Sequence, residues 1–204
     1  DVALPLGYAN MWISTFHSIC AKVLRKHCQI LGFENNFVIY DSSDQLKMIK
    51  SIIDDLGVDE RVLTPDNAKS YISSAKNQLK KPSETNEVFN DYFSEQLIRV
   101  YSVYQKRLRK NNAMDFDDLL MHAAELLKSN PDILDYYSEK WQYIMVDEYQ
   151  DTNHAQYQLI RLLSSKHKNL CVVGDDDQSI YRWRGADITN MLDCEKEVLD
   201  CLFI

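Results

Sequence analysis

Two apolar runs in this sequence each end on a cluster of acidic side chains. Residues 143–146 lead directly into Asp147 and Glu148, and residues 170–174 lead into three consecutive aspartates. Adjacent carboxylates repel one another unless a cation or a proton compensates. Mg²⁺ accepts one or two carboxylates together with waters and phosphate oxygens, and a neighbouring Glu can orient or deprotonate the water that attacks a phosphate. The clusters are therefore candidates for a magnesium-dependent phosphoryl-transfer site, although a solvated turn or a helix cap is the alternative for each acid alone.

The residues after the second cluster could contact a nucleotide and a nucleic acid. Gln178 can both donate and accept hydrogen bonds, which suits a sensor of a terminal phosphate or of a positioned water. Tyr181 and Trp183 alternate with Arg182 and Arg184. Bases of a single strand stack on such rings at roughly 1–3 kcal/mol per base, while the guanidinium groups meet phosphates. The alternative for Gln178 is a turn residue or a helix cap, and the alternative for the aromatic pair is a core Trp and Tyr flanked by surface arginines.

The elements that must position these residues are short strands alternating with helices. The apolar segments 142–148 and 169–175 are typical of buried strands, and residues 153–165 between them have a helical pattern. This alternation predicts an α/β fold with a parallel sheet covered on both faces. Ligands gather at the carboxyl ends of the strands in such sheets, and both acidic clusters lie there.

The earlier part of the chain is predicted to be mostly helical. Residues 12–32 indicate a strand end, a turn and a helix capped by Thr15 and stopped by Gly32. Few strand signals occur from residue 42 to residue 112, so this stretch is expected to be a helical insertion. Its helices are predicted at 42–57, with a capping box from Ser42 to Gln45, at 64–81, with Thr64 and Pro65 at the start and Pro82 after the end, and at 94–112. Another helix is predicted at 114–131.

The composition limits the classes of protein that the sequence can form. The chain has 204 residues, of which 45% are hydrophobic and 26% are charged, and its formal net charge is −8. That charge argues against binding nucleic acid by a basic field over the whole surface. No run approaches the ~18 apolar residues of a membrane span, and the start lacks the pattern of a signal peptide. The five cysteines form no CxxC pair, so we expect reduced cysteines in a cytoplasmic protein.

Four segments together resemble one family of motor proteins. The segments VDEYQDTNHAQYQLI (146–160) and VVGDDDQSIYRWRGAD (172–187) resemble motifs II and III of superfamily 1 DNA helicases of the UvrD, PcrA and Rep type. WISTFHSICAKVLR (12–25) is similar to an early segment of that family, and MDFDDLL (114–120) to its short motif leading back into the motor domain. The segments occur in the family's order with fitting gaps, and the resemblance covers nearly the whole chain.

The resemblance implies a RecA-like first motor domain of an ATP-driven 3′-to-5′ DNA translocase. The domain would consist of residues 1–35 and 113–204, interrupted by a helical insertion at 36–112. By this analogy Asp147 and Glu148 bind Mg²⁺, Glu148 activates the hydrolytic water, and Gln178 senses the γ-phosphate of ATP, with Asp175 also at the nucleotide.

The resemblance also implies the DNA-binding residues and the partners. Thr15, Phe16, His17 and Ser18 would follow the backbone of the tracking strand, and Tyr181, Trp183 and Arg184 would hold its bases and phosphates. A lone His near a helix start is more often a local hydrogen-bonding residue than a catalyst, so no proton chemistry is assigned to His17. The expected partners are single-stranded DNA, junctions of single-stranded and duplex DNA, and a second motor domain, with no membrane.

The sequence also departs from the family. None of its five glycines precedes a lysine, so it contains no GxxxxGK[ST] phosphate-binding loop, and the arginine-bearing motifs of a second motor domain do not occur. We therefore expect an incomplete motor domain from a longer protein, which alone hydrolyses ATP negligibly. A non-catalytic module that binds single-stranded DNA is the main alternative. A metal-dependent nuclease built on the acidic residues is less favoured, because no Lys stands two residues after an acidic pair.

Overall fold

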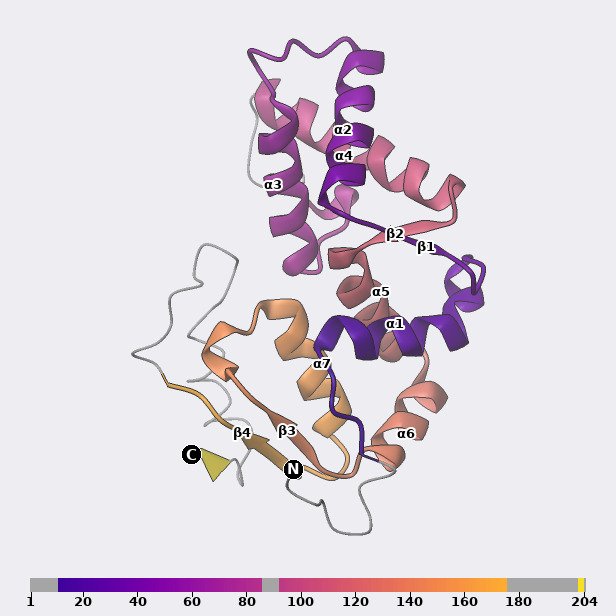
Figure 1. Cartoon of the computed structure of the whole chain (residues 1–204), viewed down its shortest axis with the longest axis vertical. Coiled ribbons are helices and arrows are strands. Elements are labelled where there is room, and N and C mark those ends of the chain that lie inside the picture. Colours follow the sequence, from indigo (N-terminus) through magenta and orange to yellow (C-terminus); the bar gives the residue numbers. More distant parts are fainter. Residues whose placement is uncertain (1–10, 86–91, 176–201, 204) are drawn as a thin grey trace, which may run out of the picture.

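The computed structural model describes residues 11–85, 92–175 and 202–203, arranged as an upper group of helices and a lower layer of helices and strands (Figure 1). Its α-helices are α1 (Phe16–His27), α2 (Ser42–Leu56), α3 (Pro65–Asn77), α4 (Tyr92–Lys110), α5 (Phe116–Ser129), α6 (Pro131–Lys140) and α7 (His154–Ser164). Its strands are β1 (Val38–Tyr40), β2 (Ala113–Asp115), β3 (Ile144–Val146), β4 (Leu170–Val172) and β5 (Leu202–Phe203). Short 3-10 helices are η2 (Cys28–Leu31), η3 (Pro82–Glu84) and η4 (Tyr149–Asp151).

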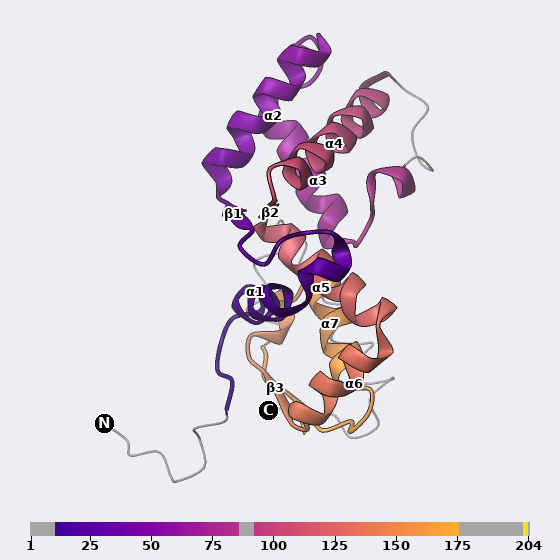
Figure 2. The ribbon, with the colours of Figure 1, turned by 90° about the vertical axis from the view of Figure 1, so that its right-hand side faces the viewer.

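Helices α2, α3 and α4 form the upper group, which we call the helical unit. Their apolar faces enclose a core of their own, which includes Ile49, Ile52, Ile53, Leu63, Ile72, Leu97, Val100, Tyr101, Tyr104 and Leu108. The chain enters this unit through β1 and leaves it through β2, and the two strands pair in parallel with Val38 opposite Ala113. Both views show the unit standing above α1, α5 and α7 (Figures 1 and 2).

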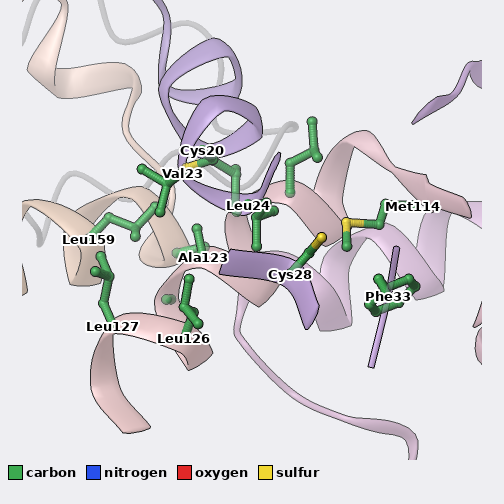
Figure 3. Packing of buried hydrophobic residues seen from close by; sticks show 14 of the residues in the cluster. Cys20, Val23, Leu24, Cys28, Phe33, Met114, Ala123, Leu126, Leu127 and Leu159 are labelled. Atoms are coloured by element: carbon green, nitrogen blue, oxygen red, sulfur yellow. The ribbon is translucent and has the colours of Figure 1, made fainter. Parts of the chain in front are cut away.

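The lower layer has a second core between α1, α5 and α7. Cys20, Val23 and Leu24 of α1 meet Ala123, Leu126 and Leu127 of α5 and Leu159 of α7, all at most 3% exposed (Figure 3). The helical spacing of these apolar residues explains why α1 and α5 form here, because each buries one continuous stripe against the other. This core holds α1 and α7, the helices next to the predicted functional residues, in a fixed relation.

Strands β3, β4 and β5 form a parallel sheet in that order. Tyr157 and Ile160 of α7 pack on β3 and β4 through Val146 and Val172. Met145, which alternates with Val146 along β3, is 75% exposed. Within the described part of the chain, this sheet is thus covered by a helix on one face, whereas the sequence analysis predicts cover on both.

Several predicted boundaries are confirmed. Helix α1 begins after Thr15, whose side chain accepts a hydrogen bond from the Ser18 backbone N–H. Gly32 ends the following 3-10 turn with a left-handed φ of 79°, which is the reason a glycine stands there. Helix α3 starts with Thr64 as its cap and Pro65 at its first position.

Other boundaries differ from the prediction. The cap of α2 is Asp41 rather than Ser42, because Asp41 Oδ1 accepts from both Ser43 N (2.8 Å) and Asp44 N (2.9 Å). Helix α5 begins at Phe116, since the preceding three residues extend as β2. Residues 12–14 are not a strand.

Four helices and strands, β1, β2, α6 and β5, were not predicted at all. The strands are too short to show an alternating pattern, because β1 has three residues and β5 has two. Among the described residues, no helix is both long and apolar enough to span a membrane.

Candidate functional site

The acidic residues that follow β3 and β4 lie at the same edge of the sheet, as predicted from parallel pairing. Val146 is in register with Val172, so Asp147 and Glu148 leave β3 beside the point where β4 runs on toward Asp175. Backbone bonds continue the pairing past the strands, from Val173 N to Val146 O at 2.8 Å. All three acidic side chains are exposed. We call Asp147, Glu148 and Asp175 the rim.

Gln150 connects the two sides of the rim. Its Nε2 donates to Glu148 Oε2 at 2.7 Å, and its Oε1 accepts from the backbone N–H of Asp175 at 3.1 Å. Gln150 is 2% exposed, so leaving its amide without these partners would cost about 1–3 kcal/mol. Gln150 was not among the residues predicted from the sequence. The available signal was an uncharged amide within an acidic cluster, next to a residue predicted to act on water.

Glu148 has an unusual backbone conformation. Its φ of 51° and ψ of 44° lie in the left-handed region, which costs a residue with a Cβ roughly 1–2 kcal/mol. Asp147 Oδ1 accepts from the Glu148 N–H at 3.0 Å and so supports this turn. The turn ends β3 abruptly and starts η4, which brings Gln150 back toward Glu148.

The rim suits a magnesium ion that arrives with a nucleotide. Asp147 is exposed, and Gln150 engages only one oxygen of Glu148, so carboxylate oxygens remain accessible to a cation. No group of three or more His, Cys, Asp or Glu side chains among the described residues could enclose a metal by itself. Mg²⁺ commonly uses one or two carboxylates and completes its shell with water and phosphate oxygens, which is compatible with this arrangement.

The predicted DNA-binding residues at the start of α1 differ in exposure. Thr15 and Ser18 are exposed, and the Thr15 hydroxyl donates to Ser18 Oγ at 3.1 Å. Phe16 is partly buried against both lower cores. His17 is partly buried, and burial lowers the pKa of its imidazole while the nearby Asp117 opposes that shift.

An aromatic side chain that the sequence analysis did not select lies beside these residues. Phe116 is 47% exposed, and its ring meets the His17 ring edge to face at a centroid distance of 5.8 Å. The signal in the sequence was an aromatic residue between two aspartates at the start of a predicted helix. Phe116 extends the polar surface of α1 with a flat apolar group of the kind on which bases stack.

The remaining predicted residues, Gln178, Tyr181, Trp183 and Arg184, lie outside the described residues. Their roles stay predictions.

Comparisons with known proteins agree with the resemblance seen in the sequence. A model of the UvrD/REP helicase N-terminal domain matches residues 4–198. The chain is 49% identical over 191 residues to "ATP-dependent DNA helicase PcrA" of Bacillus subtilis (strain 168). The aligned residues make up 94% of this chain and 26% of the relative. It is 50% identical over 187 residues to the protein of the same name from Staphylococcus aureus (strain Mu50), covering 92% and 26%. A third protein of that name, from Staphylococcus epidermidis, is 48% identical over 187 residues, again 92% of this chain and 26% of the relative. The chain thus spans about a quarter of the length of these curated relatives.

Proposed function

This chain belongs to the UvrD/REP helicase family, and we propose that it supplies most of the first motor domain of an ATP-dependent 3′-to-5′ DNA helicase. In this proposal residues 1–35 and 113–204 belong to a RecA-like domain, and residues 36–112 are its helical insertion. The observation that carries the proposal is the rim, where parallel neighbours β3 and β4 bring Asp147, Glu148 and Asp175 to one edge. The protein would act in the cytoplasm.

At the rim each carboxylate has a separate task. Asp147 holds Mg²⁺, which when bound neutralises charge on the phosphate oxygens of ATP. Glu148 accepts a proton from the attacking water. Because Gln150 occupies Oε2 of Glu148, the other carboxylate oxygen is directed to that water. Gln178 senses the γ-phosphate, and Asp175 lies at the edge of the nucleotide.

The DNA surface would begin at the N-terminus of α1. The exposed hydroxyls of Thr15 and Ser18 are suited to phosphates of the tracking strand, and Phe116 offers a ring beside His17. Phe16 supports this helix end from beneath, because it packs against the lower cores. Tyr181, Trp183 and Arg184 would complete the surface, and a second motor domain would close over the nucleotide.

The test uses a full-length protein that carries this segment. Glu148→Gln should lower ATP hydrolysis by at least ~100-fold, the scale of a lost general base, and leave binding of ATP and single-stranded DNA intact. Glu139→Gln, which changes an exposed glutamate of α6, is the matched control and should hydrolyse ATP like the wild type. Hydrolysis by Glu148→Gln at the wild-type rate would overturn the assignment.

A second candidate function is a module that binds single-stranded DNA without using ATP. The observation that favours it is the exposed ring of Phe116 beside His17 at the start of α1, a group on which bases of a single strand can stack without any nucleotide. Fluorescence titration of the 204-residue chain with labelled single-stranded DNA, with and without Mg-ATP, separates the two functions. ATP hydrolysis by this chain alone is expected to be negligible, and DNA incubated with chain and Mg²⁺ but no ATP should stay uncut.

A further inference from the structure

A buried cluster of charges fixes the C-terminal end of α3 to the start of α5. Lys76 Nζ lies 2.6 Å from Asp115 Oδ2 and 2.7 Å from Asp118 Oδ1, and these three side chains are at most 2% exposed. Tyr104 of α4 donates to Asp115 Oδ2 at 2.9 Å. We call these four residues the Lys76 cluster. Because separating such buried partners leaves an uncompensated charge, the cluster resists movement of α3 relative to α5.

The next residue, Asn77, reaches from α3 to the start of α7. Its Oδ1 accepts from Asn153 Nδ2 at 2.7 Å, and its Nδ2 donates to Asp117 Oδ1 at 3.3 Å. Asn153 is the N-cap of α7, and its own Oδ1 accepts from Gln156 N at 2.9 Å. The side-chain amide of Asn153 therefore makes two bonds: its oxygen caps α7, and its nitrogen donates a hydrogen bond to Asn77 of α3.

Asn153 ends the short segment that begins at the rim. Residues 147–153 run from β3 to α7 through η4, in which Asp151 N donates to Glu148 O at 3.0 Å. Thr152 is 3% exposed, so this segment is packed as well as hydrogen-bonded. A displacement of Asn153 is therefore expected to shift Glu148, since only a few constrained residues separate them.

The helical unit has few other connections to the rim. Its core is separate from the two lower cores, and the chain enters and leaves it through β1 and β2. In Figure 1 the lower end of α3 points toward α7, while α2 and α4 lie farther from the sheet. The contact between Asn77 and Asn153 is thus a direct side-chain link from the unit to the segment that carries Glu148.

We propose that Asn77 is a positioning residue that couples the helical unit to residues 147–153, and thereby to Glu148. This proposal rests on the proposed function in one respect, namely that Glu148 activates the hydrolytic water. A shift of the helical unit then changes the placement of that carboxylate. A change at the rim is in turn transmitted to the helical unit.

The test measures backbone amide hydrogen exchange on the 204-residue chain, without nucleotide or DNA. Two variants break the link differently. Asn77→Ala removes the acceptor, and Asn153→Ser keeps a good helix cap but is too short to reach Asn77. Each should speed exchange at residues 149–152 about fivefold, the factor for one lost hydrogen bond, and leave the α1–α5 core unchanged. Asn67→Ala, at an exposed position of the same helix, is the control and should alter neither region.

A rescue variant distinguishes coupling from general damage. Asn77→Asp combined with Asp117→Asn keeps an acceptor for Asn153 and reverses the polarity of the bond to residue 117, so exchange at 149–152 should return toward the wild-type rate. Unchanged exchange at 149–152 in both link variants would overturn the proposal, and so would an equal rise throughout the chain. Neither result bears on ATP hydrolysis by Glu148→Gln, so the two proposals fail separately.

Discussion

A Cβ atom at Gly174 would lie 2.6 Å from Oε1 of Gln150, closer than such atoms approach in proteins. Gly174 follows β4, and Gln150 is the residue that holds Glu148 and the Asp175 backbone. The glycine is therefore required by the space that the Gln150 amide occupies, and the two residues form one unit at the rim.

Gly174→Ala should destabilise the fold through this contact. The added methyl group must displace a buried, doubly hydrogen-bonded amide, so we expect a loss of about 1–3 kcal/mol in the free energy of unfolding. Urea denaturation of the 204-residue chain measures it. In a double-mutant cycle, Gln150→Ala should remove most of the penalty of Gly174→Ala, because the truncated side chain leaves room for the methyl group. Strictly additive effects would contradict the contact.

Lys76→Met should be among the most destabilising single substitutions in the helical unit. It keeps the unbranched apolar stem but leaves the buried carboxylates of Asp115 and Asp118 without their cation, at a cost of about 3–5 kcal/mol. Thermal and urea denaturation check this. Lys69→Met, a change of a partly exposed lysine on the same helix, is the control and should cost little.

The Lys76→Met penalty should shrink when Asp115→Asn and Asp118→Asn are added, because the cluster is then neutral. An equally large penalty in that neutral background would show that packing of the Lys76 stem, rather than its charge, fixes α3.

The raised pKa of Asp115 should make the stability of the fold depend on pH. Burial and the neighbouring Asp118 raise the pKa of Asp115 from 3.8 to about 6 in the folded chain, against the opposing effect of Lys76. A carboxyl group with a raised folded pKa holds its proton longer when folded than when unfolded. Its contribution to stability is therefore complete below pH 4 and is lost as the pH rises through about 6.

The measurement compares wild type and Asp115→Asn by urea denaturation between pH 4 and 7. Asn retains the helix-capping oxygen that Asp118 N uses at 2.8 Å but does not titrate. The stability of the wild type relative to this variant should fall across the window. A constant difference would mean that Asp115 titrates normally. The titration of Asp118 lies outside this pH window. Burial opposes ionisation of Asp118, but Lys76 and the other groups around it lower its pKa below the usual value, so the contribution of Asp118 to stability changes below pH 4.

The rim could be predicted from sequence because it follows from one rule. Short apolar runs separated by a helix must form parallel neighbours, and residues that follow them must share an edge, which places Asp147 and Glu148 near Asp175. Helix starts at Thr15 and Thr64 were equally predictable, since a cap depends only on the next three residues.

The buried partners of Lys76 could not be predicted from sequence. Lys76 is separated from Asp115 by 39 residues, so no local pattern joins them. A lysine in a helix is ordinarily assigned to solvent, and only the meeting of α3 with α5 buries this one. The strand β2 was missed for a similar reason. Its three residues are extended because they pair with β1, and each residue of β1 stands 75 positions before its partner in the sequence.

Phe116→Ala should weaken binding of single-stranded DNA if the surface beside His17 carries bases. Loss of one stacking ring costs roughly 1–3 kcal/mol, so the dissociation constant should rise about 5- to 150-fold in fluorescence titrations. Tyr136→Ala is the matched control, because Tyr136 is 46% exposed, close to the 47% of Phe116, but lies on α6. Equal affinities for wild type and Phe116→Ala, or an equal loss in both variants, would exclude Phe116 from the DNA surface and restrict stacking to Tyr181 and Trp183.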